Sequence, residues 1–236
     1  MELLYRSTRG AKEPVTASKA ILQGLAEDGG LFVPDSIPKL TCSMEQLAGM
    51  TYQETAYEVM KLFLTDYTEE ELKLMQAAAY VEGTFYSNIC RLQETAEFAK
   101  AMGYKKLGMS FCIGLNAEAR YIAKYFKQQG FEFYSVCCKN CSFPKKELGL
   151  KQVKPELEHE AMCNPKFQAK FLAEKGVELY ISCGLCVGHD AIFNMNAEGP
   201  VTNLVVKDRL LAHNPLGAIY SRYWKRKLGI MDDGEV

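Results

Sequence analysis

The nine cysteines of this 236-residue chain are its most chemically informative residues. Eight of them lie beyond residue 84, at Cys90, Cys112, Cys137, Cys138, Cys141, Cys163, Cys183 and Cys186, and only Cys42 precedes them. The amino-terminal residues lack the apolar segment of a signal peptide, and an odd number of cysteines does not suit a disulfide framework. We therefore expect a cytoplasmic protein whose free thiols serve metal binding or redox chemistry.

Two of these cysteines have a spacing with a known chemical use. Cys183 and Cys186 form a C-x-x-C pattern, with which two thiolates reach one metal ion or form a redox pair. Cys138 and Cys141 repeat the spacing in another loop. A second complete pair with the spacing of a zinc knuckle is absent, so the spacing leaves both uses open.

The segment from residue 88 onward alternates between strand and helix patterns. Apolar runs at 107–114, 131–138, 177–182 and 201–206 are typical of buried parallel strands. Capped or amphipathic segments between and around them predict helices at 91–104, 115–130, 164–176, 189–196 and 214–227. Strands separated by such helices predict an α/β fold with a parallel, doubly wound, Rossmann-like sheet, which we assign to residues 81–236.

The reactive side chains collect where these strands end. Ligands bind such sheets at the carboxyl ends of the strands, where helix amino termini also direct free N–H groups. The residues expected at this edge are Cys112, Cys137, Cys138, Cys163, Cys183, Cys186, His189, Asp190, Lys207 and Asp208. Cysteines that serve only as small core residues have no reason to gather at strand ends, so this convergence indicates a functional site.

Three hypotheses about this site remain open. The leading one is a soft metal, either zinc or an iron–sulfur cluster, held by thiolates of Cys112, Cys137, Cys138, Cys163, Cys183 and Cys186. The second is a thiol-dependent enzyme with Cys112 or Cys186 as the nucleophile or redox centre and His189 as the base. The third is a non-catalytic assembly module. Lys207 and nearby helix amino termini would attract a small anionic ligand.

The charge distribution separates two parts of the chain and excludes some partners. Residues 1–84 carry 7 basic and 13 acidic side chains, and residues 85–236 carry 21 and 16. The second part is only weakly basic and has no basic runs, which argues against nucleic acid. No apolar run approaches the ~20 residues that span a bilayer, which argues against a membrane protein. A homo-oligomer is left open.

Residues 1–80 predict a small, mainly helical module. Helix patterns at 16–26, 43–64 and 68–80 surround a short apolar strand at 31–33. The string Tyr5-x-Ser7-Thr8-Arg9-Gly10, followed by AILQGLAEDGGLFVPDSIPKL, resembles the amino-terminal domain of threonine synthase. In that family the module precedes a domain that binds pyridoxal phosphate. Since nothing after residue 84 resembles that domain, we expect neither threonine synthase activity nor bound pyridoxal phosphate.

The rest of the chain carries a second resemblance. The strings FAKAMGYKKLGMSFCIGL, YSVCCK, MCNPKFQA, CGLCVGHDAIF and VVKDRLLAHNPLGAIY resemble domain of unknown function family 1847, a cysteine-rich family described as metal-binding, over residues 70–236. The resemblance implies a site that uses Cys112, Cys137, Cys138, Cys163, Cys186, His189, Asp190, Lys207, Asp208, His213 and Asn214. Members of that family begin with a short cysteine cluster, and the threonine-synthase-like module takes its place here. The chain therefore resembles a fusion of two families.

The last predicted helix carries aromatic residues at core spacing. Tyr220, Tyr223, Trp224 and Leu228 recur at helical intervals among basic residues. We expect this apolar side to pack into the core and the charges to face water.

Overall fold

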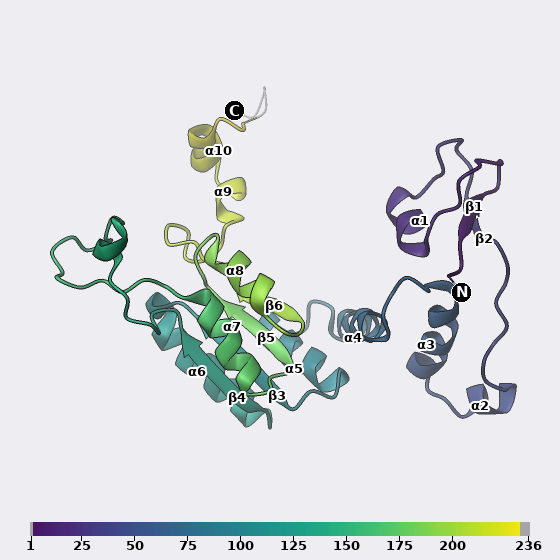
Figure 1. The fold of residues 1–236 in the computed structure, drawn as a ribbon, viewed down its shortest axis with the longest axis horizontal. Helices are drawn as coiled ribbons and strands as arrows, with labels where there is room; N and C mark the ends of the chain where they lie inside the picture. The colour runs from purple at the N-terminus through teal and green to yellow at the C-terminus, as the bar shows by residue number, and fades with distance from the viewer. Residues whose placement is uncertain (1, 232–236) are drawn as a thin grey trace. The chain divides into compact units, whose positions relative to one another are not determined.

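A computed structural model describes residues 2–231, and its contacts divide the chain between Tyr86 and Ser87 into two compact units (Figure 1). The amino-terminal unit contains β1 (Tyr5–Ser7), α1 (Ala17–Gln23), β2 (Phe32–Pro34), α2 (Met44–Ala48), α3 (Tyr52–Phe63) and α4 (Glu69–Phe85). β1 and β2 pair antiparallel. The helices that we predicted in this unit are confirmed, and α4 continues to Phe85.

The helices of this unit begin at residues that bond their free N–H groups. Thr51 accepts a hydrogen bond from Glu54 N, and the Glu54 carboxylate accepts one from Thr51 N. Thr68 and Glu71 repeat the arrangement at the start of α4. Such reciprocal capping satisfies donors that the first helical turn leaves unpaired.

The carboxy-terminal unit is an α/β sandwich around one parallel sheet. Its strands are β3 (Lys106–Phe111), β4 (Glu132–Cys137), β5 (Leu179–Cys183) and β6 (Val201–Val205), hydrogen-bonded in the order β4-β3-β5-β6. All three neighbouring pairs are parallel. The predicted fold class, a parallel doubly wound sheet of Rossmann-like arrangement preceded by a mainly helical module, is confirmed.

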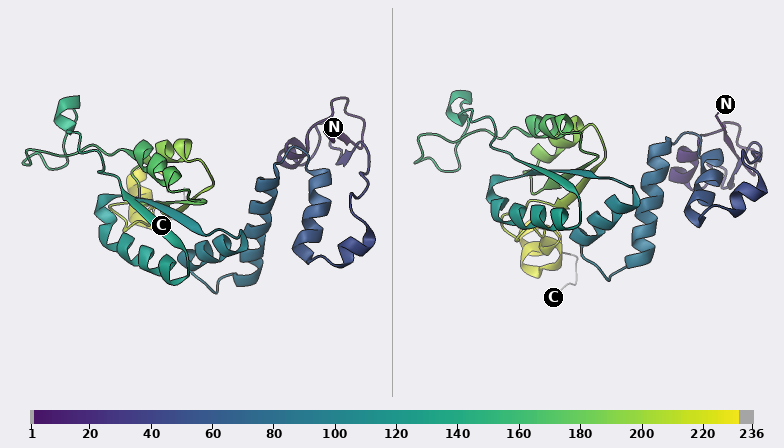
Figure 2. Two further views of the ribbon diagram at one scale, coloured as in Figure 1. Left: turned by 60° about the horizontal axis from the view of Figure 1, so that its bottom comes forward. Right: turned by 90° about the horizontal axis from the view of Figure 1, so that it is seen from below.

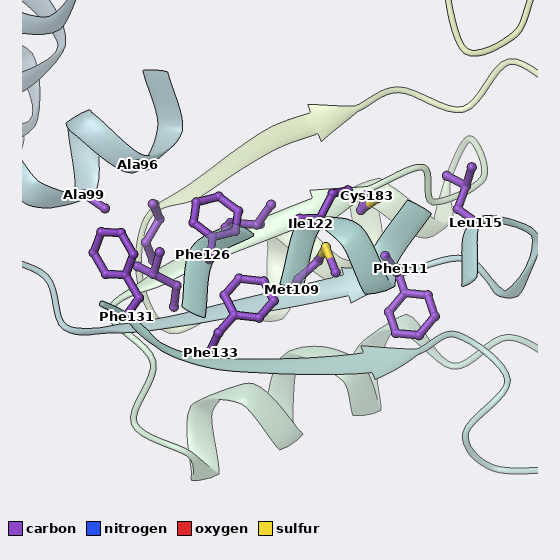
Figure 3. Packing of buried hydrophobic residues seen from close by; sticks show 14 residues of the cluster. Ala96, Ala99, Met109, Phe111, Leu115, Ile122, Phe126, Phe131, Phe133 and Cys183 are labelled. Atoms are coloured by element: carbon purple, nitrogen blue, oxygen red, sulfur yellow. The ribbon is translucent and has the colours of Figure 1, made fainter. Parts of the chain in front are cut away.

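Helices cover both faces of this sheet (Figures 1 and 2). Residues of α5 (Arg91–Ala101) and α6 (Asn116–Gln128) pack against Leu107, Met109 and Ile181 in one buried cluster (Figure 3). Residues of α7 (Pro165–Glu174) and α8 (His189–Asn196) pack against the other face in a second cluster. A short helix, η1 (Ile113–Leu115), joins β3 to α6. Each side chain at the strand ends therefore belongs to one of two separate clusters, one on each face of the sheet.

Close packing on the second face depends on a glycine in β3. A Cβ atom at Gly108 would lie 2.9 Å from both Leu172 Cδ2 and Val177 Cγ1. A side chain at this position would therefore push α7 away from the sheet. The absence of a side chain at Gly108 allows α7 to lie close to β3, and residues just before α7 to reach the strand ends.

A long connection, residues 139–163, leaves the end of β4 and returns at α7 (Figure 2). It contains the short helix η2 (Lys145–Leu148). Glu160 holds the connection together, since its carboxylate lies 2.5 Å from Lys145 Nζ and accepts a hydrogen bond of 2.7 Å from Val153 N. The hydrogen bond from Lys145 lowers the pKa of Glu160 to about 2.

The last helices differ from the prediction. The single helix expected at 214–227 is replaced by α9 (Gly217–Tyr220) and α10 (Arg222–Leu228), which meet at Ser221. Tyr220 is 76% exposed, and Tyr223 and Leu228 are also exposed. The expectation that these three side chains pack into the core is therefore wrong, because the break at Ser221 ends the continuous helical face on which it rested. Trp224, the fourth residue of that face, is partly buried. Across the described part of the chain, no helix has the length and apolar character needed to cross a membrane.

Candidate functional site

Two cysteines leave the sheet side by side at the ends of β3 and β4. The strands pair in register, with Phe111 opposite Cys137, so the next residues, Cys112 and Cys138, are neighbours. Cys138 N donates to Phe111 O at 2.9 Å, which continues the ladder by one step. Both side chains belong to the buried cluster on the α7 and α8 face. The sheet register therefore fixes these two thiols on the same face.

A third cysteine reaches this pair from the end of the long connection. Cys163 immediately precedes Asn164, whose side chain caps α7 by accepting from Phe167 N at 2.9 Å. Asn164 N donates to Cys138 O at 2.9 Å. The amide of Asn140 also donates to Cys137 O at 2.9 Å. These bonds tie the start of α7 to the end of β4 and bring Cys163 beside Cys138.

The three thiols are joined in series by hydrogen bonds, with Cys138 between Cys112 and Cys163. Ile113 N also donates to Cys138 Sγ at 3.4 Å. Cys112 is 7% exposed and Cys138 is 2% exposed, whereas Cys163 is partly exposed. We call Cys112, Cys138 and Cys163 the thiol series. Within the series, Cys163 is therefore the thiol most exposed to solvent.

The hydrogen bonds divide the protons of the series unequally. The hydrogen bond from Cys138, helped by Lys207 and opposed by burial, lowers the pKa of Cys112 to about 4. The hydrogen bond from Cys138, helped by the charges of Lys139 and His189 and opposed by burial, lowers the pKa of Cys163 to about 6. Its bonds to both neighbours, and then burial, raise the pKa of Cys138. Cys138 is therefore the protonated member of the series at neutral pH.

One proton cannot serve both neighbours of Cys138 at once. A thiol has a single S–H donor, so Cys138 donates either to Cys112 or to Cys163 at a given moment. The thiolate that does not receive this bond is stabilised by nearby cations. Lys207 lies beside Cys112, and Lys139 and His189 lie near Cys163. The site can thus hold a thiolate at either end of the series.

We expect the reactivity of Cys163 to show its lowered pKa. Alkylation requires the thiolate, so the Cys163 rate should reach half its maximum near the pKa of about 6 and fall below that pH as the thiolate takes up a proton. An ordinary cysteine does so near pH ~8.5. Iodoacetamide labelling of the reduced protein over a series of pH values, resolved by peptide mass spectrometry, measures this. Cys90, exposed at the start of α5, is the internal comparison. A half-maximal rate for Cys163 above pH ~8 would contradict the prediction.

The C-x-x-C pair is divided between two environments. Cys183 is fully buried in the cluster on the α5 and α6 face, and burial raises the pKa of its thiol to about 12. Cys186 is partly exposed, and its Sγ accepts a hydrogen bond of 2.9 Å from Arg209 Nη2. The structure thus separates Cys183 from the thiol series. Cys137 is partly buried, and its Sγ accepts from Lys139 N at 3.5 Å.

Most of the other predicted residues hold local turns. Asp190 Oδ1 accepts from Gly188 N and Ala191 N at the start of α8. Asp208 Oδ1 accepts from two backbone N–H groups, at positions 210 and 211. His213 Nδ1 accepts from Asp208 N at 3.1 Å, and Asn214 N donates to Leu211 O. Lys207 and His189, by contrast, act on the thiol series.

Two cations near the thiols were missed in the sequence. Lys139 follows Cys138 directly, and its charge lowers the pKa of Cys163. Arg209 bonds Cys186, and the charges of Cys112 and Cys163 also raise the pKa of its guanidinium. Lys139 is adjacent to Cys138, and Arg209 lies two residues after Lys207, both of which are predicted site residues. This closeness in sequence is the one feature that could have indicated them.

The thiol series has the donor type of a soft-metal site. Thiolates are ligands for zinc, iron–sulfur clusters and monovalent copper. Within residues 2–231, however, no three His, Cys, Asp or Glu side chains are arranged to hold one ion.

The amino-terminal unit is similar to one end of a known enzyme family. Residues 4–80 match the model described as Threonine synthase N terminus. Threonine synthase of Eremothecium gossypii is 43% identical over 70 residues, and that of Schizosaccharomyces pombe is 37% identical over 82 residues. The chain spans only 14% and 16% of the lengths of these two enzymes, and the matched parts are 28% and 34% of the chain. The resemblance therefore concerns the first module alone.

The greater part of the chain matches a different family. An uncharacterized protein of Methanocaldococcus jannaschii is 44% identical over 179 residues, which are 75% of this chain and 92% of that protein. The family model described as Protein of unknown function (DUF1847) matches residues 50–204, more than half of the chain, and includes every member of the thiol series. A threonine-synthase amino-terminal segment joined to this region fits the predicted fusion. The chain thus belongs to the DUF1847 family of proteins of unknown function.

Proposed function

We propose that this chain is a thiol-based redox protein that exchanges electrons with disulfides. The observation that supports this is the series of hydrogen-bonded thiols, in which Cys138 contacts a thiol on each side. A disulfide forms only between sulfurs that can approach each other closely, and Cys138 has a neighbouring thiol on each side. The proposal is the second of the sequence-based hypotheses, with Cys163 in place of Cys112 or Cys186 as the attacking residue.

Cys163 is the attacking thiolate because it combines a lowered pKa with access. The other thiol with a lowered pKa, Cys112, is buried, with 7% of its surface exposed. Attack on a disulfide requires the thiolate to approach along the S–S axis, which a buried sulfur cannot do without local opening. Lys139 and His189 stabilise the Cys163 thiolate near the surface.

The exchange proceeds in two steps. The Cys163 thiolate attacks one sulfur of a substrate disulfide, a mixed disulfide forms on Cys163, and the other half of the substrate leaves as a thiolate. Cys138 then passes its proton to the Cys112 thiolate and attacks Cys163. The Cys138–Cys163 disulfide forms, and the second half of the substrate leaves as a thiolate. Two electrons pass to the substrate, and Cys112 keeps the proton.

In this scheme Cys112 is the base that activates the resolving thiol. Its hydrogen bond with Cys138 already lies along the path of proton transfer. Lys207 hydrogen-bonds the Cys112 sulfur and keeps it deprotonated until that step. A base of low pKa is a weak one, so proton transfer depends on the charge that Cys138 develops as it approaches Cys163.

The Cys138→Ser variant tests the function. Treatment of the reduced chain with oxidised glutathione should remove two thiols per chain and yield a Cys138–Cys163 disulfide, mapped by peptide mass spectrometry. In Cys138→Ser the second step is absent, so the mixed disulfide with glutathione should persist on Cys163. The matched control is Cys90→Ser, which removes an exposed thiol at the start of α5 and should behave as the unaltered chain does.

Two outcomes would count against the proposal. One is glutathione found only on exposed thiols such as Cys90 and Cys141, with Cys138 and Cys163 still reduced. The other is zinc or iron that copurifies stoichiometrically under anaerobic conditions and masks the thiol series until a chelator removes it. That second result would favour the soft-metal hypothesis.

A further inference from the structure

Two cations that bond cysteine sulfurs near the sheet edge have no carboxylate partner. Lys207 follows β6 and hydrogen-bonds the Cys112 sulfur. Arg209, two residues later, is exposed and bonds Cys186 Sγ. Within the described residues, neither joins any of the ion pairs. Their positive charge is therefore directed at sulfur and is not cancelled by a bonded acid.

The acidic side chains of this region are engaged elsewhere. Asp208 lies between the two cations in sequence, but its Oδ1 accepts from backbone N–H groups of the turn that follows. Asp190 Oδ1 accepts from backbone N–H groups at the start of α8. Glu160 pairs with Lys145 at 2.5 Å and with Lys139 at 3.4 Å. Lys139 is thus partly neutralised, whereas Arg209 is not.

Arg209 is tied to the start of α8, whose helix packs beside Cys163. Its guanidinium donates to Cys186 Sγ at 2.9 Å, and Cys186 O accepts from His189 N, the first residue of α8, at 2.8 Å. Phe193 of α8 and Cys163 belong to the same cluster on this face of the sheet. The hydrogen bond to Cys186, and then the charges of Cys186, Cys112 and Cys163, raise the pKa of the guanidinium. A guanidinium has five N–H donors, and the structure assigns one of them to Cys186. The remaining donors on an exposed side chain suit a planar, charged acceptor such as a carboxylate.

We infer that the substrate of the thiol series is an anionic disulfide, whose carboxylate is bound by Arg209 while Cys163 attacks the sulfur. This inference rests on the proposed function and adds the substrate class. The guanidinium selects the substrate through charge and bidentate hydrogen bonds. Arg209 is therefore a residue that determines specificity, whereas the chemistry stays with the three thiols.

The test compares two disulfide probes at one sulfur. A bis(nitrobenzoate) disulfide carries two carboxylates, and a dipyridyl disulfide is neutral. The rate of mixed-disulfide formation on Cys163 is followed by peptide mass spectrometry in the full chain with Cys138→Ser, so that the product persists. Resolving the product by site excludes the exposed cysteines and Cys186, whose environment changes when Arg209 is replaced.

We expect Arg209→Gln to lower the rate with the anionic probe about tenfold, the low end of the range for electrostatic attraction of a substrate. The rate with the neutral probe should stay within about twofold, and added salt should slow only the anionic probe. The matched control is Arg120→Gln, an exposed arginine on α6, on the opposite face of the sheet, which should change neither rate.

Three outcomes would overturn the inference. An equal loss of rate with both probes would show that Arg209 only supports the local structure. An unchanged rate with the anionic probe would show that Arg209 does not contact it. Failure of both probes to react at Cys163, even with Arg209 present, would overturn the proposed function itself and this inference with it.

Discussion

Replacing Cys163 by serine should slow the formation of mixed disulfide with oxidised glutathione at the thiol series by at least ~100-fold, as loss of a nucleophile does. A serine hydroxyl is not ionised at neutral pH, whereas the Cys163 pKa of about 6 leaves most of this thiol as thiolate. The remaining thiols of the series, Cys112 and Cys138, are buried and cannot replace it. The rate is measured by mass spectrometry of the peptides that contain the three positions.

The control for this variant is Cys141→Ser. Cys141 is exposed on the same connection, and its Sγ accepts a hydrogen bond of 2.9 Å from Asn164 Nδ2. A serine hydroxyl keeps that acceptor, so the start of α7 should be unaffected. If Cys141→Ser slows the reaction as much as Cys163→Ser does, the attacking thiol has been assigned to the wrong residue.

The convergence of thiols could be predicted because it depends on strand ends. Parallel strands have their carboxyl ends at one edge of the sheet, and the sequence places Cys112 near the end of the apolar run 107–114 and Cys138 at the end of the run 131–138. The register that pairs Phe111 with Cys137 then makes these two cysteines neighbours. The regular geometry of the sheet thus makes this contact predictable from the sequence.

The face on which each thiol lies could not be predicted from spacing. Phe111 pairs with Cys183 in the register of β3 and β5, so these two residues point to the same face, and Cys112, one residue later, belongs to the other. A shift of one residue reverses the face of a strand. The C-x-x-C pattern therefore indicated a pair that the sheet divides. The register of β5, which no local pattern reveals, decides the outcome.

The roles of Cys163 and Arg209 depend on loops, where periodicity gives no guidance. Cys163 returns to the site after the connection 139–163, whose path is held by Glu160 and its bonds to Lys145 and Val153. Arg209 lies in a turn shaped by the Asp208 carboxylate. Such contacts arise from individual side-chain hydrogen bonds, each of which closes a different loop.

The second large effect that we expect concerns stability. Replacing Phe126 by alanine should lower the free energy of unfolding by about 3–5 kcal/mol, the usual cost of deleting a buried aromatic ring. Phe126 is a fully buried residue of α6, with its ring stacked on Phe133 at 5.0 Å between centroids and edge-on to Phe131 at 6.2 Å. Removal leaves a cavity that these rings cannot fill without leaving their own contacts.

Urea unfolding followed by circular dichroism measures this loss, and Tyr121→Ala is the matched control. Tyr121 lies on the same helix and is 76% exposed, so its replacement should change the free energy of unfolding by no more than ~0.5 kcal/mol. Equal effects of the two variants would contradict the burial of α6 against the sheet. Because Phe126 packs on the face opposite to Cys112 and Cys138, the folded fraction of Phe126→Ala should keep the Cys163 reactivity. Loss of that reactivity in folded protein would mean that the two faces of the sheet do not behave independently.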